Sequence, residues 1–421
     1  MIMFENKQSS KNTYLNVGIS KDVKILILSN AIGSLPWGYF MILQAIYLKI
    51  IGIEPTLIGV LMTLSGLTSA LLAIPFGILS DKYRRKPFLV TSGFLSTFSL
   101  LIYMLTTKYI HLAVASIIGG LAGAMFSSPW QAFLADKTTS ENREKAFSYS
   151  AFASSAAGTI GALLSGIPEY LQIKLSINEI TSYKPMFLLA SILMTISTFL
   201  LVPIGEVKRV KATREIFPRK SIKTIAKFCL TNALIGSGAG FIIPLFSLWF
   251  YLKFGLGGMV LGPLYAVSSA VMAIAFLAAP KLAKITGTVN SIISTQAAAT
   301  LFLVVIPLMS DFRIVSVLYV VRNFLMNMSS PIQSAFMMSL VEPEERASAS
   351  SMTGTAWSMA NSVTPSIGGY MMEHISLSLP FHICALHYAT SITLFYMFFH
   401  KTRIRTNTTV GFHNTPSSSN D

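Results

Sequence analysis

Charged side chains are scarce in this chain of 421 residues. Asp, Glu, Lys and Arg together make up 12% of it, against roughly 25% in soluble globular domains. Apolar residues account for 52%. So small a charged fraction excludes an ordinary water-soluble domain and predicts a membrane protein.

Signals for disulfides, nucleotide binding and metal binding are also missing. The two cysteines, Cys229 and Cys384, lie inside apolar stretches and form no disulfide framework. The sequence has no phosphate-binding loop ending in Gly-Lys-Ser, which argues against ATP-driven transport by this chain alone. His382, Cys384 and His387 look like metal ligands, but on a helix they diverge by about 140° to 200°. We therefore expect no metal and no other cofactor.

Long apolar stretches are what the chain does contain, and there are twelve of them. A helix of about 20 residues crosses the roughly 30 Å hydrocarbon core. Because the stretches lack the alternating pattern of barrel strands, the spans are helices. The first begins near Val23 and is too long for a cleaved signal peptide. The predicted spans cover residues 23–49, 55–79, 87–107, 109–135, 145–168, 184–205, 224–252, 258–280, 288–309, 312–340, 347–372 and 379–399.

The distribution of Lys and Arg predicts the orientation, since these residues collect in cytoplasmic loops. If both termini lie on that side, six of the 32 Lys and Arg residues fall on the other side and one lies within a span. The six are Lys49, Lys108, Lys174, Lys184, Lys253 and Arg313. We therefore expect a multi-pass protein of the cell membrane with both termini in the cytoplasm.

The net charge of +15 follows from the same rule and does not indicate a nucleic-acid partner. The basic linker between the sixth and seventh spans is either simply solvated or in contact with anionic lipid head groups. The predicted segments are a cytoplasmic N-terminal segment (1–22), an N-terminal bundle (23–205), the basic linker (206–223), a C-terminal bundle (224–400) and a disordered polar tail (401–421).

The second half of the chain repeats the first at a spacing near 203 residues. A repeat of half the chain length in an apolar sequence predicts two pseudo-symmetric six-helix bundles with a solute site between them. The matching positions are Ser127, Ser128, Pro129 and Gln131 with Ser329, Ser330, Pro331 and Gln333, and Arg143, Ala146, Ser148 and Gly166 with Arg346, Ala349, Ser351 and Gly369.

The loop after the second span carries a longer pattern. Residues 77–86 read GILSDKYRRK, which closely resembles the GxLxDxxGRK loop of the major facilitator superfamily of secondary transporters. Only the second glycine of that pattern differs. The resemblance implies an all-α membrane protein with twelve transmembrane helices in two six-helix bundles, which moves a solute by alternating access. It also implies a cytoplasmic gate, for which the candidates are Gly77, Asp81, Arg85, Lys86 and, at the end of the fourth span, Asp136.

Small residues crowd the fifth and eleventh spans, and in lipid such residues let helices approach closely. They also resemble, in blurred form, the GxxxGPxxGG pattern of antiporter branches of the family, which favours export. Tight packing without any export role explains them equally well. The expected packing positions are Gly161, Gly166, Pro365, Gly368 and Gly369.

Arg322 lies well inside the tenth span, where an unpaired charge is costly, so it must face protein or water. Either it binds an anionic group of the solute, or it joins helices by donating to neighbouring oxygens. The family resemblance places the first, fourth, seventh and tenth helices around a central cavity. The candidate cavity residues are Asn30, Trp37, Gln44, Ser127, Trp130, Gln131, Asn232, Arg322, Asn323, Asn327 and Gln333.

The function that follows is secondary or facilitative transport of a small organic solute by a monomer, with export favoured. The alternative is uptake or exchange of a small organic anion bound by Arg322. A more remote alternative is a polytopic membrane protein that transports nothing; no catalytic constellation points to an enzyme. Proton coupling usually needs a carboxylate deep in a span. Since this chain has none there, uniport and exchange stay open beside coupling to protons.

Overall fold

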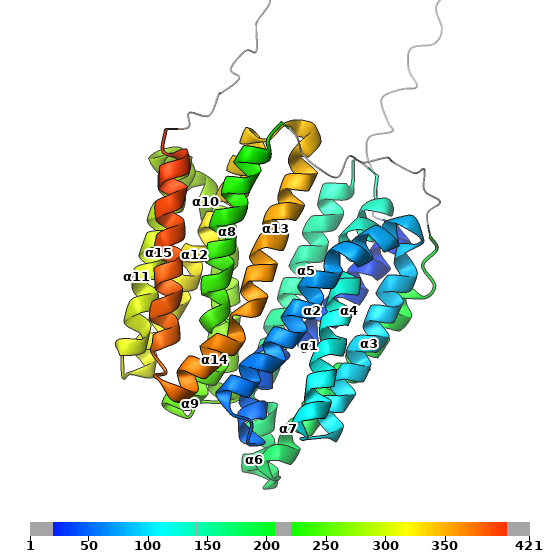
Figure 1. Cartoon of the computed structure of the whole chain (residues 1–421). Helices are drawn as coiled ribbons and strands as arrows, with labels where there is room; N and C mark the ends of the chain where they lie inside the picture. The colour runs from blue at the N-terminus through cyan, green and yellow to red at the C-terminus, as the bar shows by residue number, and fades with distance from the viewer. Residues whose placement is uncertain (1–19, 140, 207–219, 402–421) are drawn as a thin grey trace, which may run out of the picture.

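The structure, a computed structural model, describes residues 20–139, 141–206 and 220–401, and the regular elements of these residues are all helices (Figure 1). The N-terminal half contains α1 (Lys21–Ile50), α2 (Pro55–Lys82), α3 (Arg85–Leu105), α4 (Tyr109–Asp136), α5 (Arg143–Leu164), α6 (Ile167–Leu175) and α7 (Glu179–Leu201). The C-terminal half contains α8 (Ile222–Ile242), α9 (Phe246–Phe254), α10 (Gly258–Thr286), α11 (Thr288–Val305), η1 (Ile306–Leu308), α12 (Phe312–Leu340), η2 (Pro343–Glu345), α13 (Arg346–Val363), α14 (Pro365–His374) and α15 (Leu379–Phe399).

These elements form twelve spans, because four of them continue the helix before them and η2 is a single turn that leads into α13. α6 extends α5, α9 extends α8, η1 extends α11 and α14 extends α13. The helices α6 and α14 each have a proline in their first turn, where its missing N–H has no helical partner to lose. The prediction of twelve helical spans is confirmed.

Each half of the chain forms one bundle. In the N-terminal bundle α1 packs against α5 and α7, and α4 packs against α2 and α3. In the C-terminal bundle α8 packs against α13 and α15, and α12 packs against α10 and α11. The largest cluster of buried apolar side chains joins the two, with Tyr47 and Phe187 from one bundle and Phe246 and Trp249 from the other.

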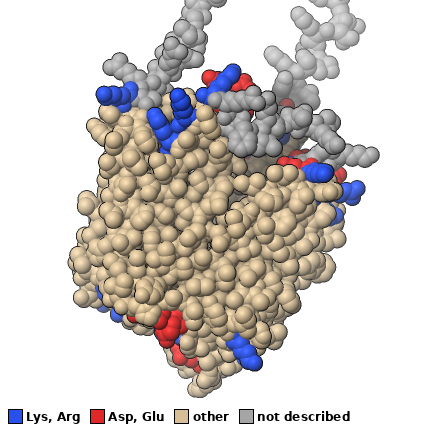
Figure 2. All heavy atoms as spheres, in the orientation of Figure 1, with Lys and Arg blue, Asp and Glu red and all other residues tan. Residues whose placement is uncertain are grey.

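On the face seen in Figure 2, charged side chains lie at the two ends of the molecule, and the broad band between them shows none. Ten helical segments of the described chain are long and apolar enough to cross a membrane. The ten do not include α12 and the pair α13–α14, whose sequences are rich in polar and small residues. These two spans are held in the bundle by packing against α8, α10 and α11.

The two ends of the molecule differ in how the bundles meet. We call the end where α7 stops and α8 begins the linker face; α1 starts and α15 ends there too (Figure 1). The other end, where α2 and α10 begin, is the opposite face. The bundles touch through α2 with α13 and α14, through α10 with α5 and α6, and through α1 with α9 and α10.

The predicted segments map onto this arrangement as follows. The helices of the two bundles run from Lys21 to Leu201 and from Ile222 to Phe399. Residues 1–19 of the predicted N-terminal segment, 207–219 of the predicted linker and 402–421 of the predicted disordered tail lie outside the described residues.

Candidate functional site

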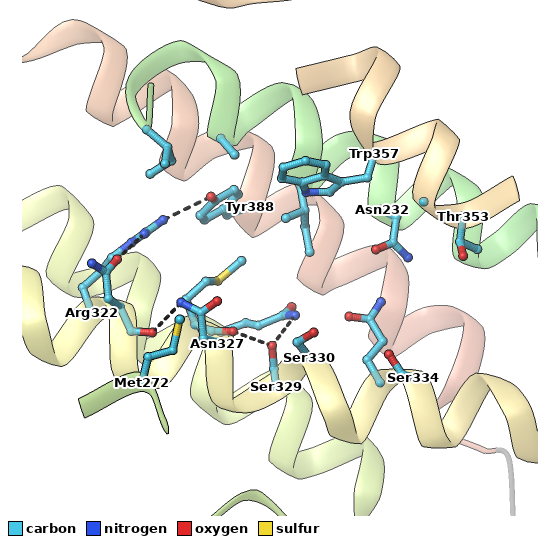
Figure 3. Close-up of a pocket in the computed structure, with 18 of the residues that line it drawn as sticks. Asn232, Met272, Arg322, Asn327, Ser329, Ser330, Ser334, Thr353, Trp357 and Tyr388 are labelled. Atoms are coloured by element: carbon cyan, nitrogen blue, oxygen red, sulfur yellow. Dashed lines mark hydrogen bonds between the residues drawn. The ribbon is translucent and has the colours of Figure 1, made fainter. Parts of the chain in front are cut away.

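A cavity of about 700 Å³ lies in the C-terminal bundle (Figure 3). Its walls come from α8, α10, α11, α12, α13 and α15. Along α12 the lining runs from Tyr319 to Met338, which is close to the end of that helix at the linker face. Ligand pockets usually measure roughly 300–1,000 Å³, so this cavity suits a small organic molecule.

Arg322 lines this cavity with its side chain almost fully buried, at an exposed fraction of 4%. Its Nη1 donates to Oδ1 of Asn323 at 2.9 Å, and its Nη2 donates to the Tyr388 hydroxyl at 3.1 Å. Nε has no hydrogen-bond partner among the described residues. Within the same residues no carboxylate forms an ion pair with this guanidinium.

Hydrogen bonds to neighbouring helices fix the polar stripe of α12, which consists of the cavity-lining residues Asn323, Asn327, Ser329, Ser330 and Gln333. Nδ2 of Asn323 donates to Oγ of Ser268 in α10 at 3.0 Å, so both ends of this amide are used. Nε2 of Gln296 in α11 donates to Oγ of Ser329 at 3.0 Å. These bonds hold the stripe, and the guanidinium beside it, in one position relative to α10 and α11.

The wall across from α12 carries Trp357, Asn232 and Thr353 (Figure 3). Among the described residues that line the cavity, Arg322 alone is charged. The lining therefore offers one fixed positive charge, several amides and hydroxyls, and aromatic surface. That set can bind a solute and orient it.

Five of the predicted cavity residues line this cavity, and all five come from the C-terminal half. They are Asn232, Arg322, Asn323, Asn327 and Gln333.

The six candidates from the N-terminal half lie elsewhere. Asn30 donates to two serines of α5, and Gln44 donates to the Tyr103 hydroxyl of α3 at 2.9 Å, so both tie helices together within one bundle. Trp130 is buried in the core of that bundle. The remaining three are exposed: Trp37, Ser127 and Gln131.

Gln296, Trp357 and Tyr388 also line the cavity and are not among the residues predicted from the sequence. Gln296 is an amide side chain inside the predicted span 288–309, and a polar side chain within a span is a signal that could have found it. The two aromatic residues carry no such signal, because aromatic side chains in spans commonly face lipid or pack between helices.

The predicted gate residues gather at the linker face of the N-terminal bundle. The Arg85 guanidinium lies between two carboxylates, with Nη2 2.7 Å from Oδ1 of Asp81 and Nη1 2.8 Å from Oδ2 of Asp136. The Lys86 ammonium donates to a carbonyl at the end of α7, and Gly77 lies against α4. These contacts join helices of a single bundle.

The predicted packing residues lie at close helix contacts. A Cβ on Gly166 would lie 3.0 Å from the backbone of α10, and one on Gly369 would lie 2.1 Å from the backbone of α2, so both glycines face the other bundle. Gly161 and Gly368 approach α1 and α8 within their own bundles. Pro365 begins α14, and its carbonyl oxygen lies against α2.

Two carboxylates reach across the bundles at the opposite face. Glu169 of α6 accepts the Met259 N–H, in the first turn of α10, at 2.6 Å. Glu373 of α14 accepts the Thr56 N–H, in the first turn of α2, at 3.0 Å. Thr56 and Met259 are 203 residues apart, so the internal repeat relates the two contacts. Each carboxylate lies at the positive end of a helix dipole and favours closure of this face.

Comparison with known proteins agrees with this architecture. The chain matches the sequence model of the Major Facilitator Superfamily over residues 26–364 and 297–418. The Uncharacterized membrane protein YJR124C of Saccharomyces cerevisiae is 19% identical over 346 residues, which cover 72% of this chain and 77% of that protein.

Solved structures share the fold at low sequence identity. The nucleoside transporter NupG has a TM-score of 0.71 at 12% identity, covering 91% of this chain and 100% of NupG. A bacterial homolog of the human lysosomal transporter Spinster has a TM-score of 0.68 at 14% identity, covering 89% of this chain and 94% of the homolog. Because the family's sequence model spans most of the chain, the chain belongs to the Major Facilitator Superfamily, and it is a membrane transporter rather than an enzyme.

Proposed function

We propose that this transporter moves a small organic solute by alternating access, with the cavity of the C-terminal bundle as the main solute site. One observation carries the proposal: the contact between the bundles is one-sided. The hydrogen bonds that join them in the described residues lie near the opposite face, whereas the cavity extends toward the linker face. This arrangement supports a conformation that is closed at the opposite face. Alternating access requires a second conformation, closed at the linker face.

The positive-inside rule supports a cytoplasmic linker face in the cell membrane. In the state seen here, an exporter would then bind its solute from the cytoplasm, whereas an importer would release its solute into the cytoplasm. Export is the direction that the family resemblance favours. No carboxylate lines the cavity among the described residues, which supports uniport or exchange over proton coupling.

Cross-linking the opposite face tests alternating access. The Ser366 N–H of α14 donates to Oγ1 of Thr63 in α2 at 3.1 Å, across the two bundles. We expect Thr63→Cys/Ser366→Cys, made with Cys229 and Cys384 replaced, to lose transport on oxidation and to regain it on reduction. The measurement is flux into proteoliposomes of a solute first identified by thermal stabilisation of the purified protein.

Each single-cysteine variant, treated with the same oxidant, is the control. Full flux through the oxidised double variant would contradict alternating access. Solute gradients imposed in each direction then distinguish export from uptake, and a flux that ignores an imposed pH gradient removes proton coupling.

A further inference from the structure

We infer that the solute is an organic anion with a single negative charge, and that Arg322 binds its anionic group. This inference rests on the proposed function, because it names the substrate class of the same cavity. It is carried by the charge balance around Arg322, by one nitrogen of its side chain that makes no hydrogen bond and by the composition of the lining.

The charge of Arg322 is incompletely balanced. A guanidinium stays protonated in a protein, and this one has an exposed fraction of 4%. Its hydrogen-bond partners, Asn323 and Tyr388, supply neutral oxygens. Arg85 of the same molecule shows how the charge of an arginine is usually balanced, because it lies between the carboxylates of Asp81 and Asp136. A buried cation whose partners are all neutral has an uncompensated charge, which a bound anion would balance.

One nitrogen of the guanidinium, Nε, makes no hydrogen bond. It has no partner among the described residues and is itself buried, while the side chain as a whole lines the cavity. The two Nη atoms are held by Asn323 and Tyr388, so the group cannot turn to satisfy Nε without breaking those bonds. Nearly all buried donors in proteins are paired, so this unpaired nitrogen is consistent with a guanidinium that still lacks a partner. A planar fork held in place suits a carboxylate.

The rest of the lining limits the charge and shape of the solute. Arg322 is the one charged residue among the described residues of the wall, so it balances one negative charge and disfavours a cation. Asn327 and Gln333 offer hydrogen bonds to the body of the solute, and Trp357 offers an apolar plane (Figure 3). The geometry thus fits a small monocarboxylate with polar groups on its body.

Matched ligand pairs test the inference on the full-length protein. The probes are small organic monocarboxylates, each paired with its primary amide of nearly equal shape, and the readout is thermal stabilisation. We expect carboxylates to stabilise the wild type and their amides to have no effect. Arg322→Gln should weaken carboxylate binding roughly 100-fold, because a buried charge partner is lost. Arg313→Gln, an exposed arginine on the same helix, is the matched control and should bind as the wild type does.

A second measurement needs no knowledge of the solute. Ser330 lines the cavity and is exposed, so Ser330→Cys, with the native cysteines replaced, can be modified by thiosulfonate reagents of either charge. The ratio of the anionic to the cationic reagent's rate should fall about tenfold when Arg322→Gln is added. Should Arg322→Gln not fold, Arg322→Lys is the substitute, because it keeps the positive charge and loses the planar guanidinium. The ratio of reagent rates should then stay as in the wild type, while the affinity for carboxylates falls.

The possible outcomes test the anionic solute at Arg322 separately from transport by alternating access. Amides that bind as tightly as carboxylates, or a reagent ratio that Arg322→Gln leaves unchanged, would overturn the anion and leave the transporter standing. Failure of the proposed function would show instead in the cross-linked protein, as flux that continues through a closed opposite face.

Discussion

At the residue scale, Arg322 of α12 occupies the place that Gly120 of α4 holds in the first half of the repeat, because Ser329 and Ser127 of the same two helices also lie 202 residues apart. The surroundings explain the difference. A Cβ on Gly120 would lie 2.2 Å from the carbonyl oxygen of Ser65 in α2. α4 therefore touches α2 through its backbone, whereas α12 at the equivalent place borders a cavity. Side chains could be added in the second half without breaking a helix contact.

Gly120→Ala is expected to destabilise the protein by about 1–3 kcal/mol, because the new methyl group forces α2 and α4 apart. Thermal unfolding of the purified protein measures the change. Gly354→Ala in α13 is the matched control: a Cβ there meets nothing within 4 Å, and alanine favours a helix over glycine by up to about 1 kcal/mol. Equal losses in the two variants would show that close helix approach is not what Gly120 provides.

The gate cluster gives a prediction about transport rate. Asp81 is 61% exposed and Asp136 is 25% exposed where they bind Arg85. Exposed ion pairs usually contribute less than about 1 kcal/mol, so Asp81→Asn should change thermal unfolding little. If the cluster controls the gate, as the family resemblance implies, the same variant should slow flux severalfold. Glu54→Gln, which removes an exposed partner of Lys49 at the opposite face, should leave flux unchanged. Normal flux in Asp81→Asn would leave the cluster with a purely structural role.

The sequence predicts a site residue correctly only where a polar side chain inside a span also lies at the cavity. A polar side chain inside a span indicates a position that does not face lipid, but it does not identify the residues or the cavity that the side chain contacts. Asn30 and Asn323 look alike in the sequence, yet Asn30 donates to serines of α5 while Asn323 lines the cavity. The distance between neighbouring helices decides between these outcomes, and it follows from packing along the whole helix.

At the element scale, helix N-termini carry contacts that hold the opposite face closed. The first turns of α2 and α10 are bound by Glu373 and Glu169 of the other bundle. A carboxylate at such a terminus contributes about 0.3–1 kcal/mol. Two contributions of that size favour closure and are still small enough to be lost in each transport cycle.

The double variant Glu169→Gln/Glu373→Gln should therefore shift the equilibrium toward opening at the opposite face, by a factor of roughly 3 to 30 from the two lost contributions. The rate at which an impermeant thiol reagent labels Thr63→Cys from that face reports the shift. Glu54→Gln is the matched control, because Glu54 precedes the first turn of α2 and pairs with Lys49 of α1, within its own bundle. A labelling rate that the double variant does not raise would assign closure to packing alone.

Helix breaks are element features that sequence patterns locate only in part. α13 ends just before Pro365, as a proline predicts. Pro129 and Pro331 lie inside α4 and α12 without ending them. The break between α8 and α9 also contains a proline, Pro244, two residues after α8 ends. Neighbouring helices decide whether a span continues past such a point, so local chemistry alone does not predict it.

At the scale of the whole molecule, the twelve spans and two bundles follow from the sequence because lipid forces each span to satisfy its own backbone. The apolar signal is weakest in α12 and α13–α14, which are not among the ten segments recognised by length and composition. The polar residues that weaken the signal include those that line the cavity. The closed face could not be predicted, since one sequence encodes both states of a transporter and the contacts between bundles select one.

Orientation in the membrane gives the last prediction. Lys281 of α10 is exposed toward the linker face, and Lys174 of α6 is exposed toward the opposite face. The positive-inside rule places the linker face in the cytoplasm. With the native cysteines replaced, Lys174→Cys should react with an impermeant thiol reagent in right-side-out vesicles, and Lys281→Cys only in inside-out vesicles. The two variants exchange the same residue types, so each controls for the other. The reverse labelling pattern would place the open cavity on the outer side, and the state seen here would then load solute for uptake rather than for export.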